Sequence, residues 1–138
     1  AVFYGIPAIA VSIMGKNPGY YDQAAQFVEN LAKKVMAHGL PEGTFLNVNI
    51  PDLSMERIRG VRISNQNLAL PCEKMEKRFD PRGQPYYWHG VAAQVPGRDS
   101  DSDVAVMAKD YISITPIMCD MTDYKSIQTL KLWDIGIR

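Results

Sequence analysis

Two asparagines at alternate positions are the clearest candidates for binding a ligand. Asn47 and Asn49 stand in residues 44–50, where polar and apolar side chains alternate as they do in a strand. Ligands of open α/β sheets bind in the crevice beyond the carboxyl ends of the strands, and Ser12 ends another apolar run, residues 6–12. We therefore expect Ser12, Asn47 and Asn49 to contact a substrate or to orient the residues that do. The alternative is that the asparagines close a turn, as this residue commonly does.

A second pattern matches the first positions of a calcium-binding loop but lacks the residues that the loop needs at its later positions. Residues 99–103 place carboxylates at alternate positions. The sixth position holds Val104 where glycine is needed, and the twelfth holds Asp110 where a bidentate glutamate is needed. The pattern instead predicts a solvated loop in which Ser102 or Asp103 caps a short helix.

The histidines and cysteines show no spacing that indicates chemistry. His38 falls at a predicted helix end and His89 in an aromatic segment, and neither has a nucleophile or acid partner nearby in sequence. Cys72 and Cys119 form no CxxC or Cys/His ligand pattern. We interpret all four as structural residues, and two unpatterned cysteines fit a reduced, cytoplasmic protein.

The elements that must position these residues follow from hydrophobic periodicity. Residues 6–12 are nearly continuously apolar, as in a parallel strand covered by helices on both faces, although Pro7 also permits an edge strand. Residues 22–38 repeat apolar side chains at helical spacing, and the strand at 44–50 follows. A strand, a helix and a strand in this order predict a right-handed crossover between parallel strands.

The remaining elements are shorter. Residues 60–64 and 111–115 are predicted strands, and residues 104–109 and 124–133 are predicted helices. Residues 1–4, followed by a glycine, look like the last turn of a helix, so we expect the chain to begin within a domain.

Composition limits the class of protein. The chain has 138 residues and 46% hydrophobic content, enough for a core, and 15 basic residues balance 15 acidic ones. This balance gives no overall attraction to a nucleic-acid polymer or a membrane surface. The sequence contains neither a long apolar run nor a basic-then-apolar leader, so it encodes no membrane span and no signal peptide.

A β-hairpin is predicted around one turn. Asp80 can accept backbone hydrogen bonds, Pro81 sets φ, and Gly83 supplies a left-handed residue, which suits a type I turn with a bulge. One flank is charged, and the other carries the aromatic residues 86–88. We expect this arm to dock on a partner, with an ordinary surface hairpin as the alternative.

Several of these segments occur together in one family. They are residues 5–12, residues 46–52, residues 80–83 with 86–88, and residues 102–116 with 120–122. In order and spacing they resemble the C-terminal half of the SurE survival-protein family. The resemblance implies a Rossmann-like, three-layer α/β domain whose C-terminal part is residues 1–138. It also implies a metal-dependent phosphatase acting on nucleoside 5′-monophosphates, a 5′/3′-nucleotidase with exopolyphosphatase activity in some members.

The chain also departs from that family. The family holds one divalent cation, Mg or Mn, with two consecutive aspartates, a serine and an asparagine, all upstream of the segment that matches residues 1–4. We therefore expect no catalytic residue and no metal ligand in this chain, and no activity from it alone. By resemblance, residues 73–90 and 122–138 form a homodimer or homotetramer with exchanged arms. The alternative is a non-catalytic oligomerisation or scaffold fragment.

Overall fold

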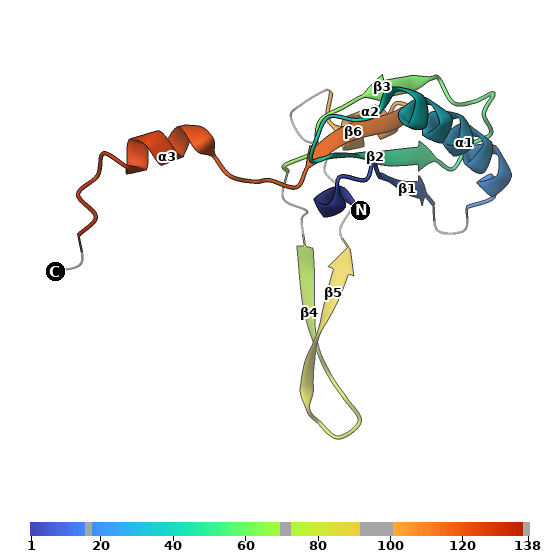
Figure 1. Ribbon diagram of the computed structural model, residues 1–138. Helices are drawn as coiled ribbons and strands as arrows, with labels where there is room; N and C mark the ends of the chain where they lie inside the picture. The colour runs from blue at the N-terminus through green and yellow to red at the C-terminus, as the bar shows by residue number, and fades with distance from the viewer. Residues whose placement is uncertain (16–17, 70–72, 92–100, 137–138) are drawn as a thin grey trace.

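The computed structural model describes residues 1–15, 18–69, 73–91 and 101–136. Its elements in chain order (Figure 1) are the 3-10 turn η1 (Val2–Tyr4), β1 (Ile9–Met14), α1 (Tyr21–His38), β2 (Thr44–Pro51), β3 (Val61–Ile63), β4 (Glu73–Phe79), β5 (Pro85–Val91), α2 (Asp103–Met107), β6 (Ile112–Met118) and α3 (Tyr124–Leu130). The predicted elements are all present, with ends that differ by a few residues.

Four strands form the main sheet, in the order β1-β2-β6-β3. β1 and β2 are parallel, as predicted for a strand, a helix and a strand, and β3 is parallel to β6. β6 runs antiparallel to β2. Consequently β6 and β3 begin at the same end of the sheet at which β1 and β2 terminate.

One face of the sheet carries the apolar core under α1. The helix is amphipathic and ends at Gly39, which has a φ of 72°. Alternate residues of β2 point toward it, because side chains of a strand alternate between the two faces. The buried core consists of Ala24 and Val35 of α1, Leu46, Val48 and Ile50 of β2, and Ile112 and Ile114 of β6.

The opposite face of the sheet is polar. Ser113 and Thr115 of β6 are buried there, and the Ser64 hydroxyl lies 2.7 Å from each of their hydroxyl oxygens. α2 packs on this face with Ala105 and Val106 buried. The chain is therefore α/β in three layers, α1, sheet and α2, as the resemblance implied.

The predicted helix cap of α2 is confirmed. The Ser102 hydroxyl accepts a hydrogen bond from the Ala105 amide at 3.3 Å, and Asp103 is the first residue of the helix. Of the residues in the abandoned calcium pattern, Asp99 and Ser100 lie outside the described residues.

The prediction that residues 6–12 are covered on both faces is wrong for this chain. β1 is an edge strand of the described sheet, begins at Ile9 and so excludes Pro7. Val11 is 41% exposed and Met14 is 44% exposed. The continuously apolar composition of this run is typical of a central strand, which is why a covered strand was predicted. In the structure, β2 is its one neighbouring strand among the described residues.

The predicted hairpin is confirmed as a two-stranded sheet of β4 and β5 that extends away from the main sheet (Figure 1). The Asp80 carboxylate accepts hydrogen bonds from the amides of Arg82 at 2.8 Å and Gln84 at 2.7 Å, and Gly83 has a φ of 79°. Tyr87 and Trp88 are 61% and 56% exposed. The arm thus presents aromatic rings to solvent within this chain.

The C-terminal arm also stands apart from the sheet. α3 follows an extended segment that leads away from β6 (Figure 1). Asp123 caps it by accepting hydrogen bonds from the amides of Lys125 at 3.0 Å and Ser126 at 3.2 Å. The helix ends at Leu130, earlier than the predicted residue 133, and Trp133 is 61% exposed.

The first residues form a short helical turn that a glycine ends, as predicted. Val2–Tyr4 is a 3-10 turn, and Gly5 follows it in the left-handed conformation with a φ of 68°. In the described part of the chain, no helix has the length and hydropathy needed to cross a bilayer.

Candidate functional site

The two predicted asparagines line one pocket on the polar face of the sheet. Asn47 and Asn49 both belong to β2, which continues to Pro51, so neither closes a turn. The pocket has a volume of about 210 Å³ and is completed by Met14 of β1 and three residues at α2, namely Asp103, Val104 and Met107. Both asparagines are partly buried, so their amides are held at the surface of the pocket.

Asp103 supplies the acidic group of this pocket. Its carboxylate accepts hydrogen bonds from the amide of Asn67 at 3.0 Å and from its own neighbour Val104 at 2.7 Å. These bonds orient the carboxylate, and sequence reasoning placed this residue only as a possible helix cap. The amide NH₂ groups can donate to phosphate oxygens, and the amide oxygens and the carboxylate can accept from sugar hydroxyls.

Ser12 lies beside the pocket without lining it. Its Cα pairs with that of Asn49, whose Cα in turn pairs with that of Ser113 on β6. These residues form one row across the polar face, and Arg62 of β3 continues it. The structure therefore brings Asn47 and Asn49 together and places Ser12 in the adjacent strand of the same row.

The described residues contain no cluster of acidic, histidine and cysteine side chains. No group of three or more His, Cys, Asp or Glu residues gathers in the described ranges, although Asn47, Asn49 and Asp103 bring oxygen atoms, the ligands that hard cations prefer, to one pocket. His38 is the exposed last residue of α1, and Cys119 is a partly buried free thiol. Cys72 lies outside the described residues.

Sequence reasoning missed a cluster at the same end of the sheet. The guanidinium carbons of Arg59 and Arg62 lie 5.1 and 4.9 Å from the centre of the Tyr111 ring. A hydrogen bond with Arg62, together with the charge of Arg59, lowers the pKa of Tyr111 below its ordinary value. The arginines are three residues apart, but Tyr111 is distant in sequence, so only the pairing of β3 with β6 reveals the cluster.

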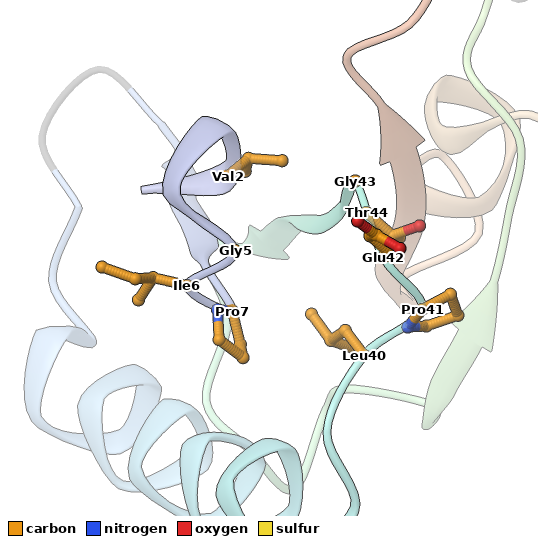
Figure 2. A pocket seen from close by; sticks show the side chains of 9 residues that line it. All are labelled: Val2, Gly5, Ile6, Pro7, Leu40, Pro41, Glu42, Gly43 and Thr44. Atoms are coloured by element: carbon orange, nitrogen blue, oxygen red, sulfur yellow. The ribbon is translucent and has the colours of Figure 1, made fainter.

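The opposite end of the sheet has a pocket of a different kind (Figure 2). It has a volume of about 330 Å³ and lies between the turn that includes Val2 and Gly5 and the loop before β2. Ile6, Pro7 and Leu40 give it an apolar lining, and Glu42 is its one titratable residue among the described ones. Besides the Glu42 carboxylate, the described lining offers the Thr44 hydroxyl, with no histidine, cysteine or lysine beside them.

Known proteins match nearly the whole length of this chain. The family model "Survival protein SurE" matches residues 1–70. The 5′-nucleotidase SurE of Desulfatibacillum aliphaticivorans is 45% identical over 98% of this chain and 53% of its own length. The 5′-nucleotidase SurE of Syntrophobacter fumaroxidans is 42% identical over 98% of this chain and 54% of its own length.

A solved structure also matches nearly all of this chain over about half of its own length. The crystal structure of the SurE protein from Aquifex aeolicus superposes with a TM-score of 0.80 at 34% identity, and the match covers 94% of this chain and 52% of that one. The chain thus spans about half the length of the relatives that it matches. On the family model, the two relatives and this structure together, the chain belongs to the SurE family.

Proposed function

We propose that this chain is part of a metal-dependent phosphatase that hydrolyses nucleoside 5′-monophosphates. The observation that carries the proposal is that two proteins named 5′-nucleotidase SurE match 98% of the chain at 42–45% identity. The polar pocket at the carboxyl end of β2 supports it, because substrates of α/β sheets bind at that end. Exopolyphosphatase activity, which the resemblance also implies, is a second activity to assay.

Within that enzyme, Asn47 and Asn49 would bind or orient the substrate. Their amides line a pocket of about 210 Å³, large enough for a phosphate group but not for a whole nucleotide. Amide NH₂ groups donate to phosphate oxygens, and amide oxygens accept from ribose hydroxyls. Ser12 would support Asn49 from the neighbouring strand.

A divalent metal, Mg or Mn, belongs to the same proposal. When bound, such an ion activates water and neutralises phosphate oxygens. By the resemblance, its ligands would come from upstream of residues 1–4, and in the described ranges no group of three or more His, Cys, Asp or Glu residues gathers. The contribution of this chain is therefore substrate contact, scaffold and assembly.

The assembly proposed is a homodimer or homotetramer joined by residues 73–90 and 122–138. The support is that both arms leave the sheet and expose large apolar side chains, including Trp88 at 56% and Trp133 at 61%. The same observation favours the alternative of a non-catalytic oligomerisation module. We place the protein in the cytoplasm, because two cysteines without a pairing pattern suit a reducing compartment.

The test is turnover of AMP by the intact protein with Asn47→Ala and Asn49→Ala. Loss of a hydrogen bond to a charged group is worth about 1.5–3 kcal/mol, so kcat/KM should fall about tenfold or more. Asn30→Ala, on the exposed side of α1, is the matched control and should leave kcat/KM unchanged. Unchanged kcat/KM in both pocket variants would show that these residues do not contact the substrate. An inactive wild type would contradict the proposed nucleotidase activity.

A further inference from the structure

Three cationic side chains surround Tyr111 at the end of the sheet where β3 and β6 begin. Arg59 precedes β3, Arg62 lies within it, and Lys109 follows α2. The two guanidinium carbons lie 5.1 and 4.9 Å from the centre of the Tyr111 ring, a distance typical of cation–π contacts. The aromatic ring therefore holds two guanidinium groups of neighbouring residues in place.

These residues line a pocket. Its volume is about 420 Å³, and Ile63, Asp101 and Val106 complete its lining. This volume lies within the roughly 300–1,000 Å³ of ordinary small-molecule sites. The lining shares no residue with the pocket of Asn47 and Asn49.

The described lining of this pocket carries a formal net charge of +2. Arg59, Arg62 and Lys109 contribute three positive charges, and Asp101 contributes the one negative charge of the lining in the described part of the chain. Within that part, neither arginine forms an ion pair with a carboxylate. Because both guanidinium carbons lie near one ring centre, they are no more than about 10 Å apart, a separation at which salt screens the repulsion between exposed charges in part. A bound anion would relieve this repulsion.

Local geometry pre-orders the arginines. Gly60 separates the loop residue Arg59 from β3 and has a φ of 135°, a conformation that other residues rarely adopt. Tyr111 is partly buried, and its ring centre lies 5.1 and 4.9 Å from the guanidinium carbons of Arg59 and Arg62. A ligand would thus meet two exposed guanidinium groups that lie against the same ring.

We propose that Arg59, Arg62, Lys109 and Tyr111 form a binding site for a phosphate-bearing anion. The planar guanidinium group presents paired donors that match the oxygens of a phosphate, and a lysine adds a point charge. The phosphate comes either from an inorganic anion such as diphosphate or from a nucleotide. The proposal does not depend on the nucleotidase activity, because binding is measured without turnover.

Isothermal titration calorimetry of the 138-residue chain, with chelator present, tests the site. The probes are inorganic diphosphate and AMP, with adenosine as the uncharged control. Arg59→Gln/Arg62→Gln should weaken binding of the anions at least tenfold, whereas Arg57→Gln should leave it unchanged, since Arg57 is exposed and does not line the pocket. Tighter binding of diphosphate assigns the site to inorganic anions, and tighter binding of AMP assigns it to nucleotides.

A second measurement uses the wild-type chain and so does not depend on the folding of a variant. Titration with diphosphate should shift the amide resonances of residues 59–62 and 109–111 before any others. Absence of saturable binding, shifts elsewhere on the surface, or equal weakening by Arg57→Gln would each overturn the proposal.

Discussion

Among the described residues, Asp120 has the pKa that its neighbours shift most strongly. The Thr122 amide donates a hydrogen bond to one carboxylate oxygen at 2.9 Å, and the Tyr124 hydroxyl donates to the other. Hydrogen bonds from Thr122, and then from Tyr124, lower the pKa of Asp120 from 3.8 to about 2. Since the folded pKa is depressed, the bonded turn is stabilised above about pH 4 and loses that stabilisation as the pH falls toward 2.

The first prediction is a carbon-13 NMR titration of the Asp120 carboxyl. It should titrate near pH 2 in the wild type, and Thr122→Ala should raise the pKa more than Tyr124→Phe does. Tyr21→Phe, which removes an exposed hydroxyl on α1, should not change it. A wild-type midpoint close to 4 would show that the turn does not persist in solution.

At this scale, the sequence predicts some site residues and misses others for an identifiable reason. Asn47 and Asn49 could be found because strand alternation places both on one face. Asp103 was found only as a cap, because its place in the lining of the Asn49 pocket depends on where α2 packs. The cluster of Arg59 and Tyr111 depends on a pairing between strands distant in sequence, which no local pattern contains.

At the scale of elements, the hairpin is the part of the chain most completely predicted. Its turn is decided by Asp80, Pro81 and Gly83, whose backbone preferences are local. The ends of other elements were less predictable. β6 continues through Pro116 to Met118 because its pairing with β2 persists, although proline is usually a reason to end a strand.

The second prediction concerns the aromatic face of that hairpin. If Trp88 anchors a subunit interface, Trp88→Ala in the intact protein should weaken association by about 2 kcal/mol, roughly thirtyfold in Kd. Light scattering across a dilution series measures this change. Tyr21→Ala, an exposed aromatic residue of α1 that is 60% accessible, is the control. An oligomer mass that stays constant on dilution in the Trp88 variant would favour an ordinary surface hairpin.

The third prediction concerns the terminal arm. α3 has seven residues, too few for stability alone, and Leu130 is 42% exposed within this chain. Deleting residues 122–138 should therefore lower both dimer content and melting temperature, the latter by roughly 2–8 °C for each kcal/mol of lost packing. Removing only residues 134–138 keeps α3 and serves as the control. A full dimer with unchanged melting would mean that the arm packs only peripherally.

At the scale of the whole molecule, class and layers were predictable but strand order was not. Hydrophobic periodicity distinguishes helix from strand, and a strand, a helix and a strand imply parallel pairing. Nothing local indicates that β6 inserts between β2 and β3 and runs against β2. The composition of β1 also suggested a covered strand, whereas its place at the edge of the described sheet leaves Val11 41% exposed.

The most direct test of the account is phosphate release from AMP by residues 1–138 alone, with Mg²⁺ or Mn²⁺ added. The resemblance places the metal ligands upstream of this chain, and the described residues contain no group of three or more His, Cys, Asp or Glu, so we expect no release above a blank without protein. The intact protein, assayed in parallel, should release phosphate and lose that activity on chelation. Turnover by residues 1–138 that survives repurification would contradict the claim that this chain supplies scaffold, substrate contacts and assembly surface but not the metal site.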